Sequence, residues 1–241
     1  MSPSSTIFVG IDDTDIIGSR GTNQLARAIV QALADRFTCS RIIRHQLLDD
    51  PRVPYTSKNG SASMTLQPIA PPDIASLIET CHHVMREWFI EGSDPGLCVA
   101  ANSAAATVSA FGRRCQQEVV TQQDARELAA ASGIQLEGLG GTNGGIIGAL
   151  AAVGLAVTED DGRVIQLGDW PDDLYGPQPL ATIRERGVEV LDIDTNADID
   201  AEFVDLVKRL RPNVRRGKCV LFVRQSEPGN QASTYHALKL P

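Results

Sequence analysis

The chain is poor in the features that mark several common classes of site. Its five cysteines are scattered without a C-x-x-C pair, so a four-cysteine zinc ribbon and a redox dithiol are disfavoured. Aromatic residues make up only 5% of the chain, which argues against a surface built on stacked bases. No apolar run of about 18 residues is present, so no membrane-spanning helix is expected. The odd cysteine count and the lack of a signal segment at the start predict a cytoplasmic protein with reduced thiols.

Positive charge is also scarce, because the net charge at pH 7 is -8. A negative field repels polyanions, so a broad nucleic-acid groove is not expected. The densest basic segment, 208–218, is either a solvated helix end and turn or a surface that contacts phosphate. The sequence has no Walker G-x-x-x-x-G-K-[ST], no G-x-G-x-x-G after its first strand, no H-x-x-x-H and no G-x-S-x-G. P-loop, Rossmann, zinc-hydrolase and serine-hydrolase sites are therefore excluded.

What is present is a regular alternation of strand and helix patterns over the first hundred residues. Leu25, Ile29, Leu33 and Phe37 repeat at helical spacing in a helix that begins near Thr22. A second helix is expected to open at Pro71-Pro72 and to continue to Trp88, and strands are expected over 6–11, 41–48, 61–69 and 96–101. The order β-α-β-β-α-β predicts an α+β fold with a ferredoxin-like sheet.

The rest of the chain continues as a mixture of helix and strand. Helices are predicted over 107–118, 124–132 and 201–210 and in the small-residue segment ending at 154, with strands over 164–167, 188–193 and 220–223. Tryptophan, aspartate, glycine and proline crowd into 169–179. This crowding predicts two domains, 1–168 and a smaller α/β domain over 169–241.

Three carboxylates, Asp12, Asp13 and Asp15, directly follow the first predicted strand. Two carboxylates about 4 Å apart repel by roughly 4 kcal/mol near a protein surface, so the fold has to offset this cost. Three interpretations compete: the carboxylates cap the next helix, they hold Mg²⁺, or one of them is a general base. Because the helix pattern begins only beyond two glycines, capping cannot use all three.

The start of that helix supplies backbone amides for an anion only a few residues from the carboxylates. Gly18 and Gly21 permit the close backbone approach that a phosphate cradle needs. A metal on one side and a helix N-terminus on the other predict a polyphosphate site of an unusual kind.

Two further loops fit the same kind of site. Lys58, Asn59 and Gly60 form either a plain turn between strands or a phosphate-facing loop. The glycine-rich run that includes 143–145 is either a packing loop or a second nest of backbone amides.

The residues at these positions resemble the archaeal tRNA agmatinylcytidine synthetases. Members of that family have a strand followed by IDDTD and then a threonine at a helix start, which match 10–15 and Thr22. Their proline-aromatic pair, followed by a basic residue and Asn-Gly, is similar to Pro54-Tyr55 with 58–60. Their glycine stretch before an IGALAA helix is similar to 143–152.

The resemblance implies an ATP- and Mg²⁺-dependent kinase-like domain joined to a ferredoxin-like one. In the family, ATP phosphorylates the carbonyl oxygen of a cytosine, agmatine then displaces the phosphate, and the threonine that matches Thr22 is itself phosphorylated. Carried onto this chain, the resemblance gives Asp12, Thr22 and Lys58 as catalytic, Gly18, Gly21, Asn59, Gly60, Asn143, Gly144 and Gly145 as ATP-binding, and Asp12, Asp13 and Asp15 as Mg²⁺ ligands.

The sequence also departs from the family. Ile16 and Asn23 stand where members usually have a serine and a second threonine. The oligonucleotide-binding fold and the zinc ribbon of the family have no counterpart here. Together with the acidic charge, these departures lead us to expect that tRNA is disfavoured as a partner and that the substrate is a small molecule.

The leading prediction is an ATP- and Mg²⁺-dependent phosphotransferase that activates a carbonyl or carboxylate oxygen of a small molecule for attack by a nucleophile. One alternative is a tRNA cytidine-modifying enzyme that conjugates agmatine and works with a partner. The other is a nucleotide-binding regulatory module without turnover. The acceptor, the nucleophile and the oligomeric state stay open.

Overall fold

The computed structural model describes residues 6–16, 18–53, 58–226 and 235–240. The chain folds into two compact units, Met1–Thr158 and Glu159–Pro241. The division falls before β6 (Arg163–Leu167), which pairs with β10 (Asn213–Arg215) inside the second unit, whereas the sequence predicts a boundary after residue 168.

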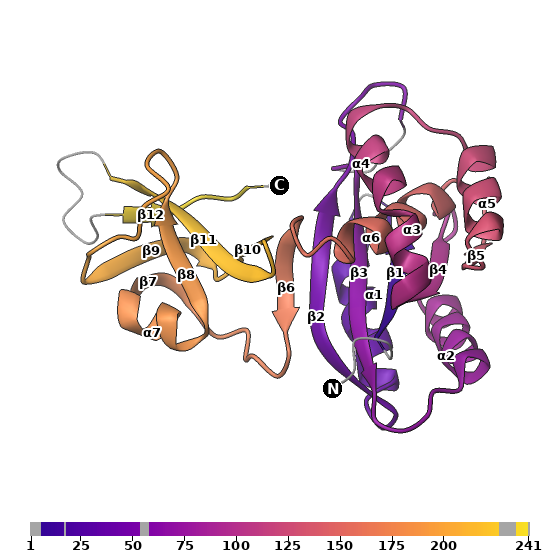
Figure 1. Ribbon diagram of the computed structural model, residues 1–241, viewed down its shortest axis with the longest axis horizontal. Coiled ribbons are helices and arrows are strands. Elements are labelled where there is room, and N and C mark those ends of the chain that lie inside the picture. The colour runs from indigo at the N-terminus through magenta and orange to yellow at the C-terminus, as the bar shows by residue number, and fades with distance from the viewer. Residues whose placement is uncertain (1–5, 17, 54–57, 227–234, 241) are drawn as a thin grey trace. The chain divides into compact units, whose positions relative to one another are not determined.

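The first unit is a mixture of helices and antiparallel strands (Figure 1). Its elements are β1 (Ile7–Asp12), α1 (Thr22–Ala32), β2 (Phe37–Gln46), β3 (Gly60–Pro68), α2 (Ile74–Glu87), β4 (Gly96–Ala101), α3 (Asn102–Thr107), α4 (Ser109–Gln117), α5 (Gln122–Ala131), β5 (Gln135–Gly138) and α6 (Ile146–Ala156). The strand order in its sheet is β5-β4-β1-β3-β2, and each neighbouring pair is antiparallel. The predicted order of strands and helices over the first hundred residues is therefore present.

The structure differs from the sequence-based expectation at three places in this unit. α1 ends at Ala32, and Phe37, which the sequence pattern assigns to the helix, opens β2. The helix predicted over 107–118 is α4, and α3, which ends at Thr107 directly before it, was not predicted. The short strand β5 was not predicted.

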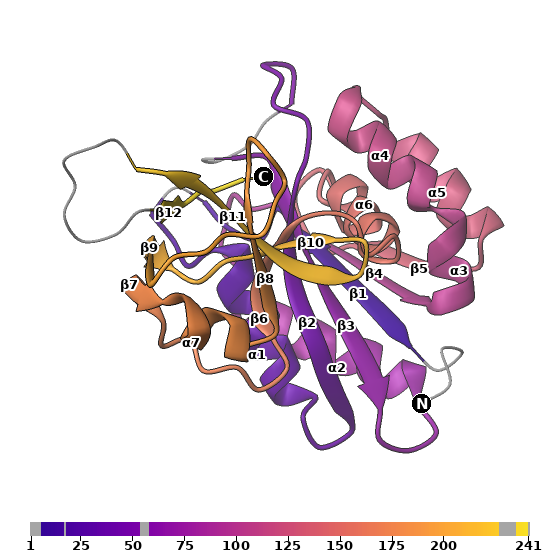
Figure 2. The same ribbon diagram turned by 60° about the vertical axis from the view of Figure 1, so that its left-hand side comes forward.

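Helices cover both faces of this sheet. α1 and α2 lie against one face and α6 against the other, with α3, α4 and α5 packed outside α6 (Figure 2). α6 is buried along nearly its whole length and its side chains are small and apolar. Because a Cβ on Gly10 would overlap the Ala149 carbonyl, a glycine in β1 is what allows α6 to lie directly on the strand.

The second unit is a smaller assembly of strands with one helix. Its elements are β6, β7 (Tyr175–Pro179), α7 (Leu180–Glu185), β8 (Val188–Asp192), β9 (Phe203–Arg209), β10, β11 (Lys218–Gln225) and β12 (Tyr235–Ala237). β11 pairs antiparallel with β10 and β12 and parallel with β8. Strands therefore appear at all three places where the sequence predicted them in this part of the chain.

The prediction of a helix over 201–210 is wrong, because this segment forms β9. Val204 and Leu206 are buried while Val207 is 60% exposed, and the strand pairs with β7 and β12. The basic segment 208–218 consequently forms strand ends and a turn rather than a helix end. Within it, Arg211 forms a bidentate ion pair with Asp172.

Candidate functional site

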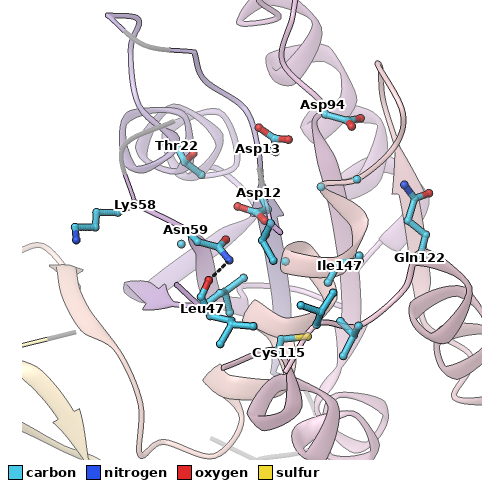
Figure 3. Close-up of a pocket in the computed structure, with 18 of the residues that line it drawn as sticks. Asp12, Asp13, Thr22, Leu47, Lys58, Asn59, Asp94, Cys115, Gln122 and Ile147 are labelled. Carbon is cyan, nitrogen blue, oxygen red and sulfur yellow. Dashed lines mark hydrogen bonds between the residues drawn. The ribbon is translucent and has the colours of Figure 1, made fainter. Parts of the chain in front are cut away.

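The acidic loop after β1 lines a cavity of about 290 Å³ in the first unit (Figure 3). One side of the cavity carries carboxylates from two separate loops, and the other side is apolar. The acidic residues that line the cavity are Asp12, Asp13, Asp15, Asp94 and Glu118, and the apolar side includes Leu47, Cys115, Val119, Val120 and Ile147. The cavity therefore offers a charged compartment for phosphates beside an apolar one.

Asp12 is held at the end of β1, where it is in register with Gly96 of β4. A Cβ on Gly148 would overlap the Asp12 carboxylate, so a glycine in the first turn of α6 makes room for this side chain. Burial raises the pKa of Asp12 to about 7, against a backbone hydrogen bond from Asp13 that lowers it. The nearby charges of Asp13 and Asp15 raise this pKa further.

Asp13 and Asp94 bring two loops together. Asp13 has a left-handed backbone (φ 48°), and its carbonyl accepts a hydrogen bond from the Asp94 amide (3.0 Å). Burial raises the pKa of Asp13 to about 6, and the charges of Asp94 and Asp15 add to the effect. The Oδ2 atom of Asp94 accepts a hydrogen bond from the Thr142 hydroxyl. The Oδ1 atom of Asp94 is buried and has no hydrogen-bond partner among the described residues. Such an orphaned acceptor is costly unless a ligand satisfies it.

Asp15 lies at the N-terminus of α1. Its carboxylate is 3.3 Å from the position that a Cβ on Gly21 would occupy, and Gly21 is the N-cap of the helix. Gly21 itself has no side chain with which to cap α1. The capping interpretation of the aspartates stays a prediction beside the metal interpretation. The Thr14 hydroxyl donates to the Thr22 hydroxyl (3.0 Å), which fixes Thr22 at the cavity wall.

The glycine loop places a second helix N-terminus at the same cavity. Gly144 and Gly145 line it, and α6 begins directly after Gly145 with no acidic residue in its first turn. The Gly145 amide donates to the Asp94 carbonyl (3.1 Å), and a Cβ on Gly145 would overlap that carbonyl. The loop therefore packs closely and faces the cavity, and its interpretation as a nest of backbone amides stays a prediction. Asn143 has φ 64° and its side chain lies against Gly138 instead.

The loop around Lys58 behaves mainly as a turn. The Lys58 side chain points away from Asp12 (Figure 3), and its Nζ lies 4.0 Å from a carboxylate oxygen of Asp49. The Asn59 side chain donates to the Leu48 carbonyl (2.7 Å), so it closes the connection between β2 and β3. Pro54 and Tyr55, which carry part of the family resemblance, lie outside the described residues.

The structure brings most of the predicted site residues to one cavity. Those that line it are Asp12, Asp13, Asp15, Thr22, Lys58, Asn59, Gly60, Gly144 and Gly145. Gly18 lies in an exposed turn with φ 88°, and Gly21 supports Asp15 from the helix cap. Sequence reasoning missed Asp94, Thr142, Gln122 and Gly148, which also line the cavity. The roles of all these residues stay predictions.

Among the described residues, no group of three or more His, Cys, Asp or Glu side chains is placed to hold a metal ion by itself. Mg²⁺ usually takes only one or two protein carboxylates and completes its shell with water and phosphate oxygens. The clustered aspartates of the cavity and the orphaned Asp94 oxygen fit such an open site.

Comparison of the sequence with family models and with curated proteins gives no significant match. Solved structures do match. They include TiaS in complex with tRNA and ATP (24% identity, TM-score 0.56), apo TiaS, described as a tRNA agmatidine synthetase (24%, 0.54), and TiaS in complex with tRNA, AMPCPP and agmatine (23%, 0.54). Each match covers 62% of this chain but only 35% to 36% of the TiaS chain. At this level of identity the similarity concerns the fold.

These matches correct one expectation from the sequence. We expected tRNA to be disfavoured as a partner. Of the three structures named above, however, two hold tRNA on a protein of this fold. Net charge is a poor guide here, because charges are screened over about 10 Å and the local surface decides what binds. Among the described residues, no helix is long and apolar enough to cross a membrane.

The chain has a TiaS-like fold, and the cavity at the end of β1 is lined by both acidic and apolar residues.

Proposed function

We propose that this protein is an ATP-dependent tRNA-modifying enzyme whose active site is the cavity at the end of β1. The observation that carries the proposal is the acidic loop, which faces two helix N-termini in a TiaS-like fold. Helix N-termini attract phosphate, while carboxylates need a cation before a polyphosphate can approach them. ATP with Mg²⁺ satisfies both requirements at once.

Asp12, Asp13 and Asp15 would hold Mg²⁺, which supplies charge neutralisation on the polyphosphate. The amides at the start of α1 would bind phosphate oxygens. The first amides of α6, those of Gly145, Ile146 and Ile147, donate to backbone carbonyls, so α6 would contribute the positive end of its helix dipole instead. Thr22, held by the hydroxyl of Thr14, lies at the cavity wall as the phosphate-facing hydroxyl. Lys58 turns toward the phosphates only after its side chain leaves Asp49.

The reaction that fits this site is a two-step substitution. The γ-phosphoryl group of ATP passes to a carbonyl oxygen of a tRNA base, and ADP leaves. An amine nitrogen then bonds to that carbon, the carbon–oxygen bond breaks, the amine gives up a proton to solvent or a protein carboxylate, and inorganic phosphate departs. The apolar side of the cavity suits a flat base, because Leu47, Cys115 and Ile147 carry no charge, although the Glu118 carboxylate also lines the cavity.

The finer description of the fold belongs to this proposal. A β-α-β-β-α-β order with strand sequence β4-β1-β3-β2, antiparallel throughout, supports the ferredoxin-like description. The layer of α3 to α6 on the opposite face supports the kinase-like nucleotide-binding part, because its last helix begins at the cavity.

The test is tRNA-dependent ADP release. The protein is incubated with Mg²⁺, ATP, agmatine and unfractionated tRNA, and ADP is measured together with the nucleoside masses of the digested tRNA. We expect ADP release that requires tRNA and a mass increase on one nucleoside. Asp12→Asn abolishes both, while Asp35→Asn, an exposed aspartate after α1, leaves them unchanged. ADP release that is indifferent to tRNA, or no ADP release at all, contradicts the proposal.

A further inference from the structure

We propose that Arg44 is the built-in counter-charge of the acidic loop and makes the site select Mg²⁺ bound to a polyphosphate over the free cation. This inference rests on the function proposed above. Arg44 was not among the residues predicted from the sequence, and it comes from a strand rather than from the loops that surround the cavity.

The register of the sheet places Arg44 beside the end of β1. Arg44 is paired with Ala62 of β3, and Ala62 is paired with Ile11 of β1. Residues paired across neighbouring strands share a face of the sheet, so Arg44 lies on the face of Ile11. The Asp12 carboxylate, which lies against Gly148 of α6, projects from the opposite face at the end of the same strand. The face of Arg44 is the one that α1 covers, and α1 begins beside Asp15.

A glycine leaves the space that the guanidinium fills. The Arg44 Cζ is 2.7 Å from the position that a Cβ on Gly60 would occupy, and one of its terminal nitrogens is closer still. Gly60 lines the cavity, so the guanidinium lies directly behind the cavity wall. Its Nη1 donates to the Gln46 side-chain oxygen (3.1 Å), which holds the group in that position.

The charge of Arg44 acts on the aspartates. Burial lowers the pKa of Arg44, while the negative charges of Asp12 and Asp15 raise it. In return, Arg44 lowers the pKa of Asp12. A partly buried guanidinium keeps its charge in proteins, and this one is placed where two carboxylates compensate it.

Other cations in the neighbourhood are directed elsewhere in the described structure. Lys58 points away from Asp12 and approaches Asp49, and Arg20 stacks on the Trp88 ring with its Cζ 3.9 Å from the ring centre. Arg52 forms a bidentate pair with Asp50. Arg44 therefore differs from these three in that its charge acts on the acidic loop.

A fixed positive charge at this position has opposite effects on two ligands. It repels a free divalent cation, so the loop binds bare Mg²⁺ weakly, but it attracts the negative polyphosphate that carries the cation. Removal of the charge should therefore tighten binding of the free cation and weaken binding of the metal–nucleotide complex. A purely structural role predicts that both kinds of binding weaken together.

The experiment measures Mn²⁺ binding by electron paramagnetic resonance on the metal-free protein, without nucleotide or tRNA. We expect Arg44→Gln to bind Mn²⁺ roughly 10-fold more tightly than the native protein and to bind Mg²⁺–ATP roughly 10-fold more weakly. Arg44→Lys, which keeps the charge, should stay close to native in both measurements. Arg41→Gln is the matched control, because it removes the same charge from the same strand on the opposite face.

Arg44→Met provides a second neutral variant whose long apolar side chain fills the same space, and it should reproduce the tighter Mn²⁺ binding. Unchanged or weaker Mn²⁺ binding in both neutral variants, with native binding that depends on Asp12, overturns the role of Arg44 and leaves the proposed function standing. Absence of both Mn²⁺ binding and Mg²⁺–ATP binding in every variant, the native protein included, overturns the metal site itself and the proposed function with it.

Discussion

Replacement of Asp12 by asparagine should make the metal-free protein more stable at neutral and alkaline pH, although it removes a predicted metal ligand. The carboxylate is placed against Gly148 at the end of a buried strand, and its charged form is disfavoured there. Asparagine has nearly the same shape and carries no charge. The substitution therefore removes the electrostatic cost and keeps the packing.

The size of the effect follows from the pKa shift. Burial raises the pKa of Asp12 from 3.8 to about 7. A carboxyl whose pKa is higher in the folded state binds its proton more tightly when folded, so stability falls as the pH rises between these two values. A shift of about 3 pKa units corresponds to about 4 kcal/mol at pH 8, which is an upper estimate because the loop can relax. We expect a gain of about 2 to 4 kcal/mol for Asp12→Asn.

The assay is urea unfolding in a chelator at pH 5 and pH 8, followed by circular dichroism. The native protein should lose stability from pH 5 to pH 8 more steeply than Asp12→Asn. Added Mg²⁺ should restore stability at pH 8 in the native protein only, because a ligand that binds the folded state stabilises it. Asp35→Asn controls for the loss of one negative charge. If Asp12→Asn proves equally or less stable than the native protein at pH 8 in chelator, the account of a strained acidic loop is refuted.

Three further predictions concern residues around the same loop. Gly148→Ala forces a methyl group into the Asp12 carboxylate, so it should cost about 1 to 3 kcal/mol in thermal unfolding and abolish ATP-analogue binding. Thr14→Val removes the hydroxyl that donates to Thr22, so it should cost about 1 kcal/mol in urea unfolding and slow ADP release, while Thr14→Ser retains both. Asp94→Asn removes one like charge from Asp13, so titration of the Asp13 carboxyl by NMR should move to lower pH; an unchanged titration would show that the two carboxylates do not interact.

The elements that build the site were largely predictable because their patterns are unambiguous. β1 is an apolar run that ends in charge, and α1 repeats apolar residues at helical spacing. α2 also begins with a regular cap, in which the Asp73 side chain accepts from the Ser76 amide (3.0 Å). Each signal is local, so one stretch of sequence is sufficient to read it.

The error at β9 shows where local patterns fail. Phe203, Val204, Leu206 and Val207 satisfy the spacing of an amphipathic helix as well as the alternation of a strand. The structure chooses the strand because β7 and β12 pair with its two edges. The residues of β9 alone contain no signal that predicts which strands will pair with it.

Asp94 was missed for a similar reason, although one step of topology would have found it. In an antiparallel pair, the start of one strand lies beside the end of its partner. β4 pairs antiparallel with β1, so the residues just before β4 meet those just after β1. Asp94 therefore lies beside Asp13, although the two are far apart in the sequence. Prediction of the sheet order would have brought the fourth carboxylate to the site.

The reason for crowding carboxylates at the end of a buried strand lies in what surrounds them. Glycines at 96, 145 and 148 allow α6 and β4 to approach the loop so closely that the Asp12 side chain is partly buried at the cavity wall. Such confinement raises the free energy of the charged loop but orients its oxygens before a cation arrives. The start of α1, the start of α6 and the guanidinium of Arg44 offset part of the repulsion from fixed positions. The remaining part of the repulsion favours binding of a divalent cation, and the same positive groups make a cation that carries polyphosphate the ligand that matches the whole cavity.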